Sequence, residues 1–397
     1  MRYLGRRRSF VLLTVTTTAM LAGSGALFSR LRAQETHAIK EISPGLSLLS
    51  VSTTTPNGPL RYWLVKAGKP LWNLDIEVAN RSDVFKKRSV RNLIQQAGAT
   101  VAVNGGFFAY GGAAVGAVKQ SNEWHRLPWK SRTALGWDQS GAQMGPLSGR
   151  CVLTATLTDG TSQSFDVPLN GFTLPGTHTP ITNGLSVLTR RFKEKITLKP
   201  EQSAVLVRNG EIIARGLTGE FSWPLDALEG DFYVVASGLT GFDARTNPVK
   251  TLNWKVVLNE GPTTGVASRF TAFPTILGAG PRLVDNGQVR TTEKEEDFRP
   301  DVVARGPRTA VGWDKEGNWL LLVADGRQAV SVGLTIPETA TLFQQLGAIE
   351  AMNLDGGSST QLVINGELVN TPSGFDPVNP LRPREVMVSN ALVLKAK

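Results

Sequence analysis

Two aspartates that each precede a glycine are the residues of this 397-residue chain best suited to catalysis. Asp355 stands in the segment AIEAMNLDGGSST, and Asp325 ends the apolar run of LLLVADGRQ. Either carboxylate could act as a nucleophile or as the base for a water molecule. Arginines accompany them, and arginine can hold a phosphate or carboxylate through two parallel hydrogen bonds. The predicted catalytic residues are therefore Asp355, Asp325, Arg327 and Arg308.

The segment around Asp355 offers further polar groups. A period of two would put Asn353 on the same face as Asp355, with Met352 and Leu354 in the core. Paired glycines allow positive φ and let a ligand approach the backbone N–H groups, and the hydroxyls that follow could complete an anion-binding nest. A similar loop occurs in VAVNGGFFAY. The predicted substrate-binding residues are Asn104, Gly105, Gly106, Arg132, Asn353, Gly356, Gly357, Ser358, Ser359 and Thr360.

Each of these features also has a purely structural explanation. An Asp-Gly-Gly sequence is often a tight turn whose polar side chains satisfy its own backbone. Arg308 and Arg327 could form surface ion pairs. Phe107 and Phe108, which follow the first Gly-Gly pair, are more often core residues than a platform for a sugar. The arrangement of these motifs in the fold must decide between the two explanations.

The sequence favours no metal or cofactor. Oxygen atoms of Asn104, Asn353, Asp325 and Asp355 could bind Ca²⁺ or Mg²⁺, but no calcium-binding loop is recognisable. The chain has three histidines and one cysteine, Cys151. These numbers argue against a histidine-rich zinc site, a Ser-His-Asp triad and an intramolecular disulfide. We therefore expect a cofactor-free protein, with Ca²⁺ or Mg²⁺ left open.

Three Asn-Gly pairs indicate hairpins in the elements that must position these residues. They occur in VLVRNGEIIAR, RLVDNGQVR and LVINGELVN, each between alternating apolar residues. A two-residue type I′ turn needs positive φ at both central positions, which Asn-Gly provides. The pattern predicts an antiparallel, β-rich architecture.

One helix is clearly marked in TIPETATLFQQLG. Thr335 and Glu338 form the S/T-x-x-E capping box, Pro337 lies in the first turn, and Gly347 ends the helix. The segments 94–106 and 343–357 resemble each other as helix end, glycine, short strand, asparagine and Gly-Gly. RTALGWDQSG (132–141) and RTAVGWDKEG (308–317) form a second similar pair. We predict an α+β fold: a single β-rich domain with mixed sheets, few helices and two similar helix-strand-Gly-Gly units.

The first 33 residues have the pattern of a targeting segment. A basic start precedes an uncharged run from Ser9 to Phe28, and Arg7-Arg8 resembles a twin-arginine export signal. We expect a signal peptide or N-terminal anchor over 1–33, strands and a helix over 34–100, and the main domain over 101–397. Export would place the protein in the periplasm or outside the cell, with membrane contact only through an uncleaved N-terminal segment.

The net charge argues against a nucleic-acid partner. The whole chain carries +10, but six arginines lie in the first 33 residues. The remaining 37 basic and 33 acidic residues give +4, which is too little for binding to a phosphate backbone. We expect a glycan or sugar-phosphodiester partner instead.

Several motifs together resemble the phosphodiester glycosidase domain family. They are VAVNGGFF, GAGPRLVDNGQV, RTAVGW, VADGR, GLTIPETATLFQQLGAIEAMNLDGGSSTQLVINGELVN and REVMVSNALVL, in the order of the family from about Val101 to the C-terminus. The resemblance implies hydrolysis of a glycosyl phosphodiester at the anomeric carbon, on an envelope glycan or exopolysaccharide. A non-catalytic envelope carbohydrate-binding or exopolysaccharide-assembly protein is the alternative. The sequence leaves open the sugar, the group beyond the phosphate and the stereochemical course.

Overall fold

A computed structural model of the chain describes residues 36–171, 184–237, 249–260, 269–374 and 384–397. β-Strands form most of it, and its α-helices are α1 (Val90–Ala97), α2 (Pro300–Val303) and α3 (Ile336–Gln345). The predicted β-rich architecture is confirmed. All pairs of neighbouring strands in these residues are antiparallel, and a parallel contact occurs only as the isolated bridge between Leu169 and Val187. The expectation of mixed sheets is therefore wrong for the described strands, because α1 and α3 each connect two strands that are separated by a third strand antiparallel to both.

An eight-stranded sheet is covered on its outer face by α3. Its order is β1-β2-β3-β22-β21-β23-β19-β20. The strands are β1 (Thr36–Ser43), β2 (Leu46–Thr55), β3 (Gly58–Ala67), β22 (Trp319–Ala324), β21 (Arg308–Asp314), β23 (Ala348–Asn353), β19 (Arg282–Asp285) and β20 (Gln288–Val289). Ile336, Ala340 and Phe343 of α3 are fully buried in a cluster with Leu322 and Ala351 of the sheet. The apolar stripe of the helix therefore faces this sheet, as its spacing requires.

A five-stranded sheet carries α1 in the same way. Its order is β25-β24-β5-β26-β4. The strands are β25 (Glu367–Leu368), β24 (Leu362–Ile364), β5 (Val101–Asn104), β26 (Asn390–Ala396) and β4 (Trp72–Val78). Ala102 of β5 packs toward Leu93 and Ile94 of α1, whereas Val101 and Val103 belong to the cluster on the opposite face. This alternation follows from the two-residue period of a strand.

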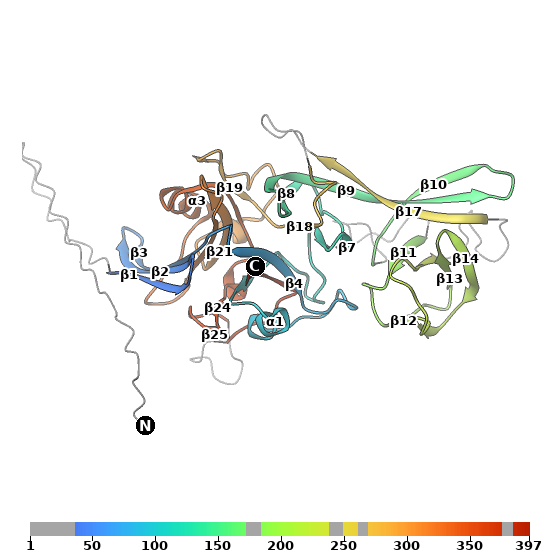
Figure 1. Cartoon of the computed structure of the whole chain (residues 1–397), viewed down its shortest axis with the longest axis horizontal. Helices are drawn as coiled ribbons and strands as arrows, with labels where there is room; N and C mark the ends of the chain where they lie inside the picture. The colour runs from blue at the N-terminus through green and yellow to red at the C-terminus, as the bar shows by residue number, and fades with distance from the viewer. Residues whose placement is uncertain (1–35, 172–183, 238–248, 261–268, 375–383) are drawn as a thin grey trace, which may run out of the picture.

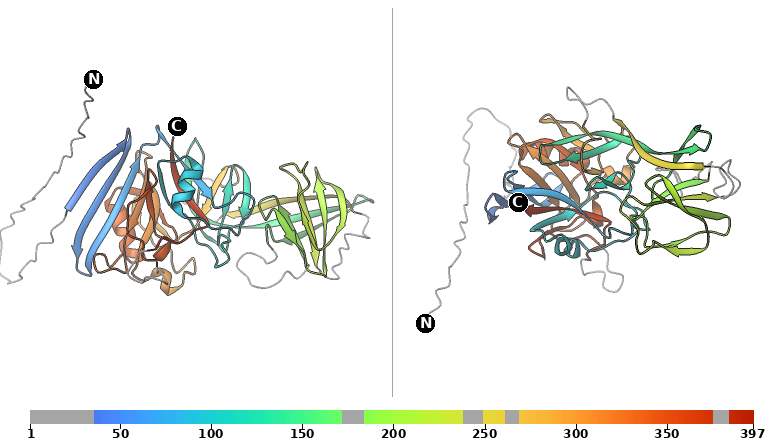
Figure 2. Two further views of the ribbon diagram at one scale, coloured as in Figure 1. Left: turned by 90° about the horizontal axis from the view of Figure 1, so that it is seen from below. Right: turned by 45° about the vertical axis from the view of Figure 1, so that its right-hand side comes forward.

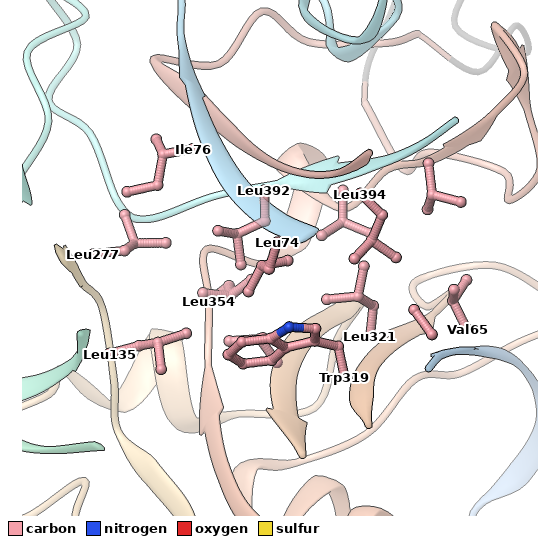
Figure 3. Close-up of a cluster of buried hydrophobic side chains, with 14 of the residues drawn as sticks. Val65, Leu74, Ile76, Leu135, Leu277, Trp319, Leu321, Leu354, Leu392 and Leu394 are labelled. Atoms are coloured by element: carbon pink, nitrogen blue, oxygen red, sulfur yellow. The ribbon is translucent and has the colours of Figure 1, made fainter. Parts of the chain in front are cut away.

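The main hydrophobic core lies between these two sheets. Figure 3 shows Leu74 and Leu392 of the five-stranded sheet facing Leu321 and Trp319 of the eight-stranded sheet. Leu354, which follows β23 directly, is fully buried in the same cluster. The layers thus run α3, eight-stranded sheet, core, five-stranded sheet, α1. Burial on this scale is the main source of stability of such a body.

A third sheet extends away from this body. It contains eleven strands, with β10 attached to β9 beside the main order β11-β16-β13-β14-β17-β9-β8-β18-β6-β7. The strands are β6 (Val118–Gln120), β7 (Glu123–Arg126), β8 (Arg132–Trp137), β9 (Ala142–Leu157), β10 (Ser162–Val167), β11 (Leu185–Thr189), β13 (Gln202–Arg208), β14 (Glu211–Leu217), β16 (Phe232–Ser237), β17 (Val249–Glu260) and β18 (Thr275–Gly278). A small sheet of β12 (Lys195–Thr197) and β15 (Glu220–Ser222) joins them. The long strands β9 and β17 reach from the body into a separate lobe, at the right of Figure 1 and again in Figure 2. This lobe has its own core around Leu188, Val205, Tyr233 and Val235.

The three predicted Asn-Gly hairpins are confirmed. They connect β13 to β14, β19 to β20, and β24 to β25. Both residues of each pair have positive φ, for example 51° and 82° at Asn209 and Gly210. These are the backbone angles that a type I′ turn requires.

The predicted helix and the two similar units are also present. Thr335 and Glu338 cap α3 through both reciprocal hydrogen bonds of a capping box. The units are α1 with β5 and Gly105-Gly106, and α3 with β23 and Gly356-Gly357. Each unit packs its helix on the outer face of a different sheet and directs its Gly-Gly loop to the same end of the body.

The predicted targeting segment, 1–33, lies outside the described residues. Among the residues that the structure does describe, none of the helices is long and apolar enough to cross a bilayer.

Candidate active site

Three strands of the eight-stranded sheet bring the predicted catalytic residues to one edge. β22 and β23 both run antiparallel to β21, which lies between them. Ala324 is paired with Arg308, so Asp325 follows β22 beside the start of β21. Asn353 is paired with Ala310, so the segment leading to Asp355 leaves β23 at the same edge. With strands about 4.8 Å apart, the ends of β22 and β23 are separated by about 10 Å across Arg308.

The Gly-Gly loop of the other unit meets this edge. The main-chain N–H of Asp355 donates to the carbonyl of Gly105 at 3.0 Å, and Asn104 Nδ2 donates to the carbonyl of Asp355 at 2.7 Å. The two loops, 250 residues apart in sequence, therefore form one rim. The sequence predicted both loops, and the structure shows that they touch.

Asp355 is the carboxylate at this rim that keeps contact with solvent. It lies in the bend after β23, and its Oδ1 accepts a hydrogen bond from the N–H of Gly356 at 2.9 Å. Burial raises the pKa of Asp355 to about 6, against the opposing effect of hydrogen bonds from the Ser359 side chain and from Gly356. A carboxyl group with this pKa can take or release a proton near neutral pH.

Asp325 has a similar pKa but a different setting. Its side chain is 1% exposed. Oδ1 accepts from Asn370 Nδ2 at 3.0 Å and from the N–H of Thr371 at 3.1 Å. Burial raises the pKa of Asp325 to about 6, although these bonds and the charge of Arg61 lower it. The carboxylate is thus held behind the rim.

Asn370 connects Asp325 to the Asp355 loop. The same Nδ2 that bonds Asp325 also donates to the carbonyl of Thr360 at 3.1 Å, and Oδ1 accepts from the N–H of Leu362 at 2.8 Å. The sequence analysis did not single out this residue. Its place at the end of the LVINGELVN motif, two residues after β25, is the signal that could have drawn attention to it.

Arg327 is the exposed cation of the rim. Its φ is 60°, in the left-handed region that residues with a side chain rarely adopt. The guanidinium lies against two glycines, since a Cβ on Gly357 would be 3.2 Å from Nη1 and one on Gly306 would be 3.4 Å from Nε. No ion pair or side-chain hydrogen bond of Arg327 is recorded among the described residues. A strained backbone that presents a cation is typical of a functional site.

Arg308 is placed differently from the sequence expectation. It is 4% exposed, and Nε, Nη1 and Nη2 all donate to main-chain carbonyls, of Leu334, Val302, Val303 and Ala304. Burial and the charge of Arg327 lower the pKa of Arg308 to about 10. Its guanidinium therefore braces the segment 302–304 and adds positive charge beneath the rim, and direct contact with a phosphate would break these bonds.

Asn353 and Asn104 also serve the framework. Asn353 is 1% exposed, and its Nδ2 donates to the carbonyls of Gly280 and Leu354. β23 ends at Asn353, so the alternation of the strand does not extend to Asp355, and the expected common face is not formed. Met352 and Leu354 are buried as predicted. The side-chain amide of Asn353 is thus directed into the protein, as is that of the fully buried Asn104.

The expected anion-binding nest is closed by the chain itself. The N–H groups of Gly356, Gly357, Ser359 and Thr360 donate to Asp355 Oδ1, Pro307 O, Gly356 O and Gly357 O. Those of Gly105 and Gly106 donate to Asn390. Thr360 is fully buried, and Ser358 remains partly exposed.

Close packing explains why glycine is needed in these loops. A Cβ on Gly105 would lie 2.0 Å from Asn390 Oδ1, and one on Gly356 would lie 2.9 Å from the carbonyl of Pro307. The glycines allow the loops to approach each other and β21.

Arg132 forms no recorded hydrogen bond with the Asp355 loop among the described residues. It begins β8, and its Nε and Nη2 donate to the carbonyls of Glu296 and Asp297 at 3.2 and 3.1 Å. Arg308 has the corresponding place in the second RTA(L/V)GWD segment and also holds main-chain carbonyls. The sequence similarity between the two segments thus extends to what their arginines bind.

The described residues contain no group of three or more His, Cys, Asp or Glu side chains placed to hold a metal ion. Of the four suggested oxygen ligands, Asn104 Oδ1 accepts from Thr309 Oγ1 and from the N–H of Gln361. This amide oxygen is therefore committed to the framework.

Fold and rim together define a β-rich protein that presents two aspartates of raised pKa and an exposed arginine at one edge of a sheet. The model of the family described as phosphodiester glycosidase matches residues 203–395, just under half of the chain. Residues 203–395 thus match the phosphodiester glycosidase family, which confirms the resemblance seen in the motifs of this part of the chain. Residues 101–202 lie outside the matched range, although Gly105 contacts Asp355 within it.

Relatives with curated names match a shorter stretch. N-acetylglucosamine-1-phosphodiester alpha-N-acetylglucosaminidase of Mus musculus is 41% identical over 125 residues, which cover 29% of this chain and 24% of the relative. The protein of that name from Homo sapiens is 36% identical over 125 residues with the same coverage. The match spans about a quarter of the length of these relatives.

Two solved structures share the fold. A hypothetical protein of Synechocystis superposes with a TM-score of 0.69 at 24% identity, over 91% of this chain and 64% of the other. A protein of Burkholderia pseudomallei, named as a suspected exported protein, gives 0.70 at 17% identity, over 96% and 100%. At these identities the likeness concerns the fold alone.

Proposed function

We propose that this protein is an exported hydrolase that cleaves a glycosyl phosphodiester at the anomeric carbon of the sugar. The observation that carries the proposal is the placement, at one rim, of the partly exposed Asp355 and the exposed Arg327, on loops that meet at Gly357. The match of residues 203–395 to the phosphodiester glycosidase family supports the reaction class. The catalytic and binding roles of individual residues are part of the proposal.

The reaction needs little assistance from a general acid. The bond between the anomeric carbon and the phosphate oxygen breaks with its electron pair on the phosphate, through an oxocarbenium-like state. A phosphate monoester with a second pKa of about 6 leaves without strong help from a proton donor. Water supplies the new hydroxyl, so the products are a free sugar and a phosphomonoester. The protein must hold the phosphate and assist the attack on carbon.

Arg327 and Asp355 suit these two tasks. Arg327 has a guanidinium held against Gly357 and Gly306, ready to bond two phosphate oxygens. Asp355, once ionised, serves as the nucleophile or as the base for water. Arg308 contributes positive charge from beneath the loop without leaving its carbonyl partners.

Asp325 is assigned a positioning role within this proposal. Its buried carboxylate fixes Asn370 and Thr371, and Asn370 in turn holds the carbonyl of Thr360. Replacing Asp325 should therefore disturb the Asp355 loop from behind. This refines the sequence prediction, which named Asp355 and Asp325 as the two candidate carboxylates.

The substrate is proposed to belong to the cell envelope or to an exopolysaccharide. The names of the mammalian relatives point to an N-acetylglucosamine phosphodiester, and the arginine-rich start of the chain points to export. The structural neighbour from Burkholderia pseudomallei, itself named as a suspected exported protein, supports the same location.

The test is hydrolysis of a synthetic N-acetylglucosamine-1-phospho-sugar diester by the purified protein, followed by NMR with and without a chelator. We expect release of free sugar, loss of release in Asp355→Asn, and partial loss in Asp325→Asn. Inhibition by the chelator would show that a cation takes part. Binding without release, unchanged in both variants, would contradict the hydrolase and support the non-catalytic carbohydrate-binding alternative.

A further inference from the structure

Four side chains form a partly exposed shelf next to the Asp355 loop: Phe107, Trp129, Arg132 and Phe298. Phe107 follows Gly105-Gly106, and the carbonyl of Gly105 accepts the hydrogen bond from Asp355. The rings of Phe107 and Phe298 lie 5.6 Å apart with a tilt of 46°. The shelf is therefore continuous with the rim.

Phe298 lies near the end of β23 through its contact with Gly280. A Cβ on Gly280 would be 3.3 Å from its ring, and the N–H of Gly280 donates to the carbonyl of Asn353 at 3.0 Å. Asp355 follows two residues later. The shelf is thus connected to this loop through Gly280 and Gly105, at Asn353 and Asp355, and Arg327 lies against the same loop at Gly357.

Arg132 is fixed in the middle of the shelf. Its guanidinium carbon lies 4.4 Å from the centre of the Trp129 ring and 3.9 Å from that of Phe298. Nε and Nη2 bond the carbonyls of Glu296 and Asp297, and no bond of Nη1 is recorded among the described residues. Stacking and two hydrogen bonds remove most of the rotamer freedom of this arginine, so its remaining donors are preorganised.

The charges around the shelf compensate one another. Asp297 forms an ion pair with Lys130, and the buried carboxylate of Glu296, which accepts from the N–H and hydroxyl of Thr133, lies close enough to act on the charge of Arg132. At Arg327 no such compensation is recorded among the described residues. An anion is thus favoured at Arg327, whereas the shelf offers aromatic faces and directed donors without a net charge.

We propose that the shelf binds the uncharged pyranose ring whose anomeric carbon reacts, while Arg327 binds the phosphate. The apolar face of a pyranose packs on aromatic rings, and its hydroxyls accept from a fixed arginine. The diester then lies across the Asp355 loop with its scissile bond over the carboxylate. This inference rests on the proposed function and adds the residues that bind the sugar and the orientation of the diester.

Two separate titrations test the assignment without any bond being cleaved. The probes are methyl N-acetyl-α-glucosaminide for the shelf and inorganic phosphate for Arg327, and binding is followed by the indole N–H signals of the tryptophans. Phe298→Leu keeps apolar volume and removes the ring, Phe298→Tyr keeps the ring, and Arg132→Lys keeps the charge and removes the planar fork.

We expect Phe298→Leu and Arg132→Lys to weaken glycoside binding about fivefold, the scale of one lost stacking contact, with phosphate binding changed less than about twofold. Phe298→Tyr should bind the glycoside like the parent. Arg327→Gln should show the reverse pattern. Equal effects of all variants on both probes, or no glycoside binding by the parent, would overturn the proposal.

The two proposals fail separately. Glycoside and phosphate binding that separate as expected, without diester hydrolysis, would support the shelf and refute the hydrolase. Hydrolysis of the diester, together with glycoside binding that is unchanged in the shelf variants, would support the hydrolase and refute the shelf. Thermal unfolding of each variant shows whether a lost signal reflects lost folding.

Discussion

The side-chain amide of Asn104 donates a 2.7 Å hydrogen bond to the main-chain carbonyl of Asp355. Its Oδ1 accepts from Thr309 Oγ1 at 2.7 Å and from the N–H of Gln361 at 3.1 Å. One fully buried amide thus joins β5, β21 and the loop of the candidate nucleophile. The geometry of that loop depends on the first Gly-Gly unit, outside the matched family range.

Asn104→Ala should therefore weaken both folding and catalysis. The substitution leaves the Thr309 hydroxyl, the Gln361 N–H and the Asp355 carbonyl without a partner in a buried place. We expect a loss of about 2–4 kcal/mol in the free energy of unfolding, measured by urea denaturation. The exposed Asn253→Ala is the matched control and should change the value by less than about 0.5 kcal/mol. A variant as stable as the parent would show that the Asn104 amide does not stabilise the contact between β5, β21 and the Asp355 loop.

Gly105→Ala should disrupt the rim through a steric clash. A Cβ at this position would lie 2.0 Å from Asn390 Oδ1, the atom that accepts the N–H of Gly106. We expect the variant to unfold more easily and to lose diester hydrolysis, because the two loops cannot keep their contact. Gly111→Ala, whose Cβ would meet no atom within 4 Å, is the control and should retain stability and activity. Full activity in Gly105→Ala would mean that the loops can separate without cost.

Local patterns in the sequence predicted the parts of this fold that depend on local chemistry. Asn209-Gly210 adopts positive φ because of its own residue types, and Thr335 with Glu338 caps α3 through bonds within four residues. Asp355 and Asp325 were found from their place after apolar strands. Such features need no knowledge of distant contacts.

Contacts that form only in the folded chain decided the rest. Arg308 looks like a ligand for an anion in sequence, yet its donors bind carbonyls of 302–304 and Leu334. The N–H groups of Gly105, Gly106 and Gly357 look free in sequence, yet the first two donate to Asn390 and the third to the carbonyl of Pro307. Asn370 escaped notice because its partner Asp325 is 45 residues away. No local pattern encodes these pairings.

The pH dependence of hydrolysis should report Asp355. Its pKa of about 6 means that the carboxylate needed for attack is lost as the pH falls through this value. We expect kcat/KM to fall about tenfold per pH unit below about pH 6. Stopped assays at a series of pH values measure this decrease, which is the acid limb of the pH profile. An acid limb near pH 4, the range of an unperturbed carboxyl group, would contradict the assignment of the limb to Asp355, whose pKa is raised by burial.

Asp325→Asn provides the control for that profile. If Asp325 only positions the loop, the variant should lower kcat and leave the acid limb near pH 6. Disappearance of the limb in Asp325→Asn would instead make Asp325 the titrating group, and Asp355 would lose its proposed role.

Asp325 should also make the protein less stable at neutral pH than at acid pH. Its folded-state pKa of about 6 lies above the usual value of 3.8, so the folded state holds this proton more tightly than the unfolded state. The contribution is fully favourable below about pH 4 and is lost as the pH rises through about 6. Asp325→Asn keeps an acceptor for Asn370 and the N–H of Thr371 but carries no charge. We expect the variant to be more stable than the parent at neutral pH, by at most about 3 kcal/mol, and equal to it below about pH 4.

Asp138→Asn gives a control of opposite sign. Hydrogen bonds from Ser140 and Gly141 and the charge of Arg269 lower the pKa of Asp138, so its stabilising contribution is present at neutral pH and is lost on acidification through the lowered pKa. This variant should be less stable than the parent at neutral pH and should approach it in acid. Urea denaturation of the three proteins across this range measures both differences. A decrease in stability for Asp325→Asn at neutral pH would show that the bonds of its carboxylate outweigh the cost of burying the charge, and that the aspartate is retained for the fold rather than for catalysis.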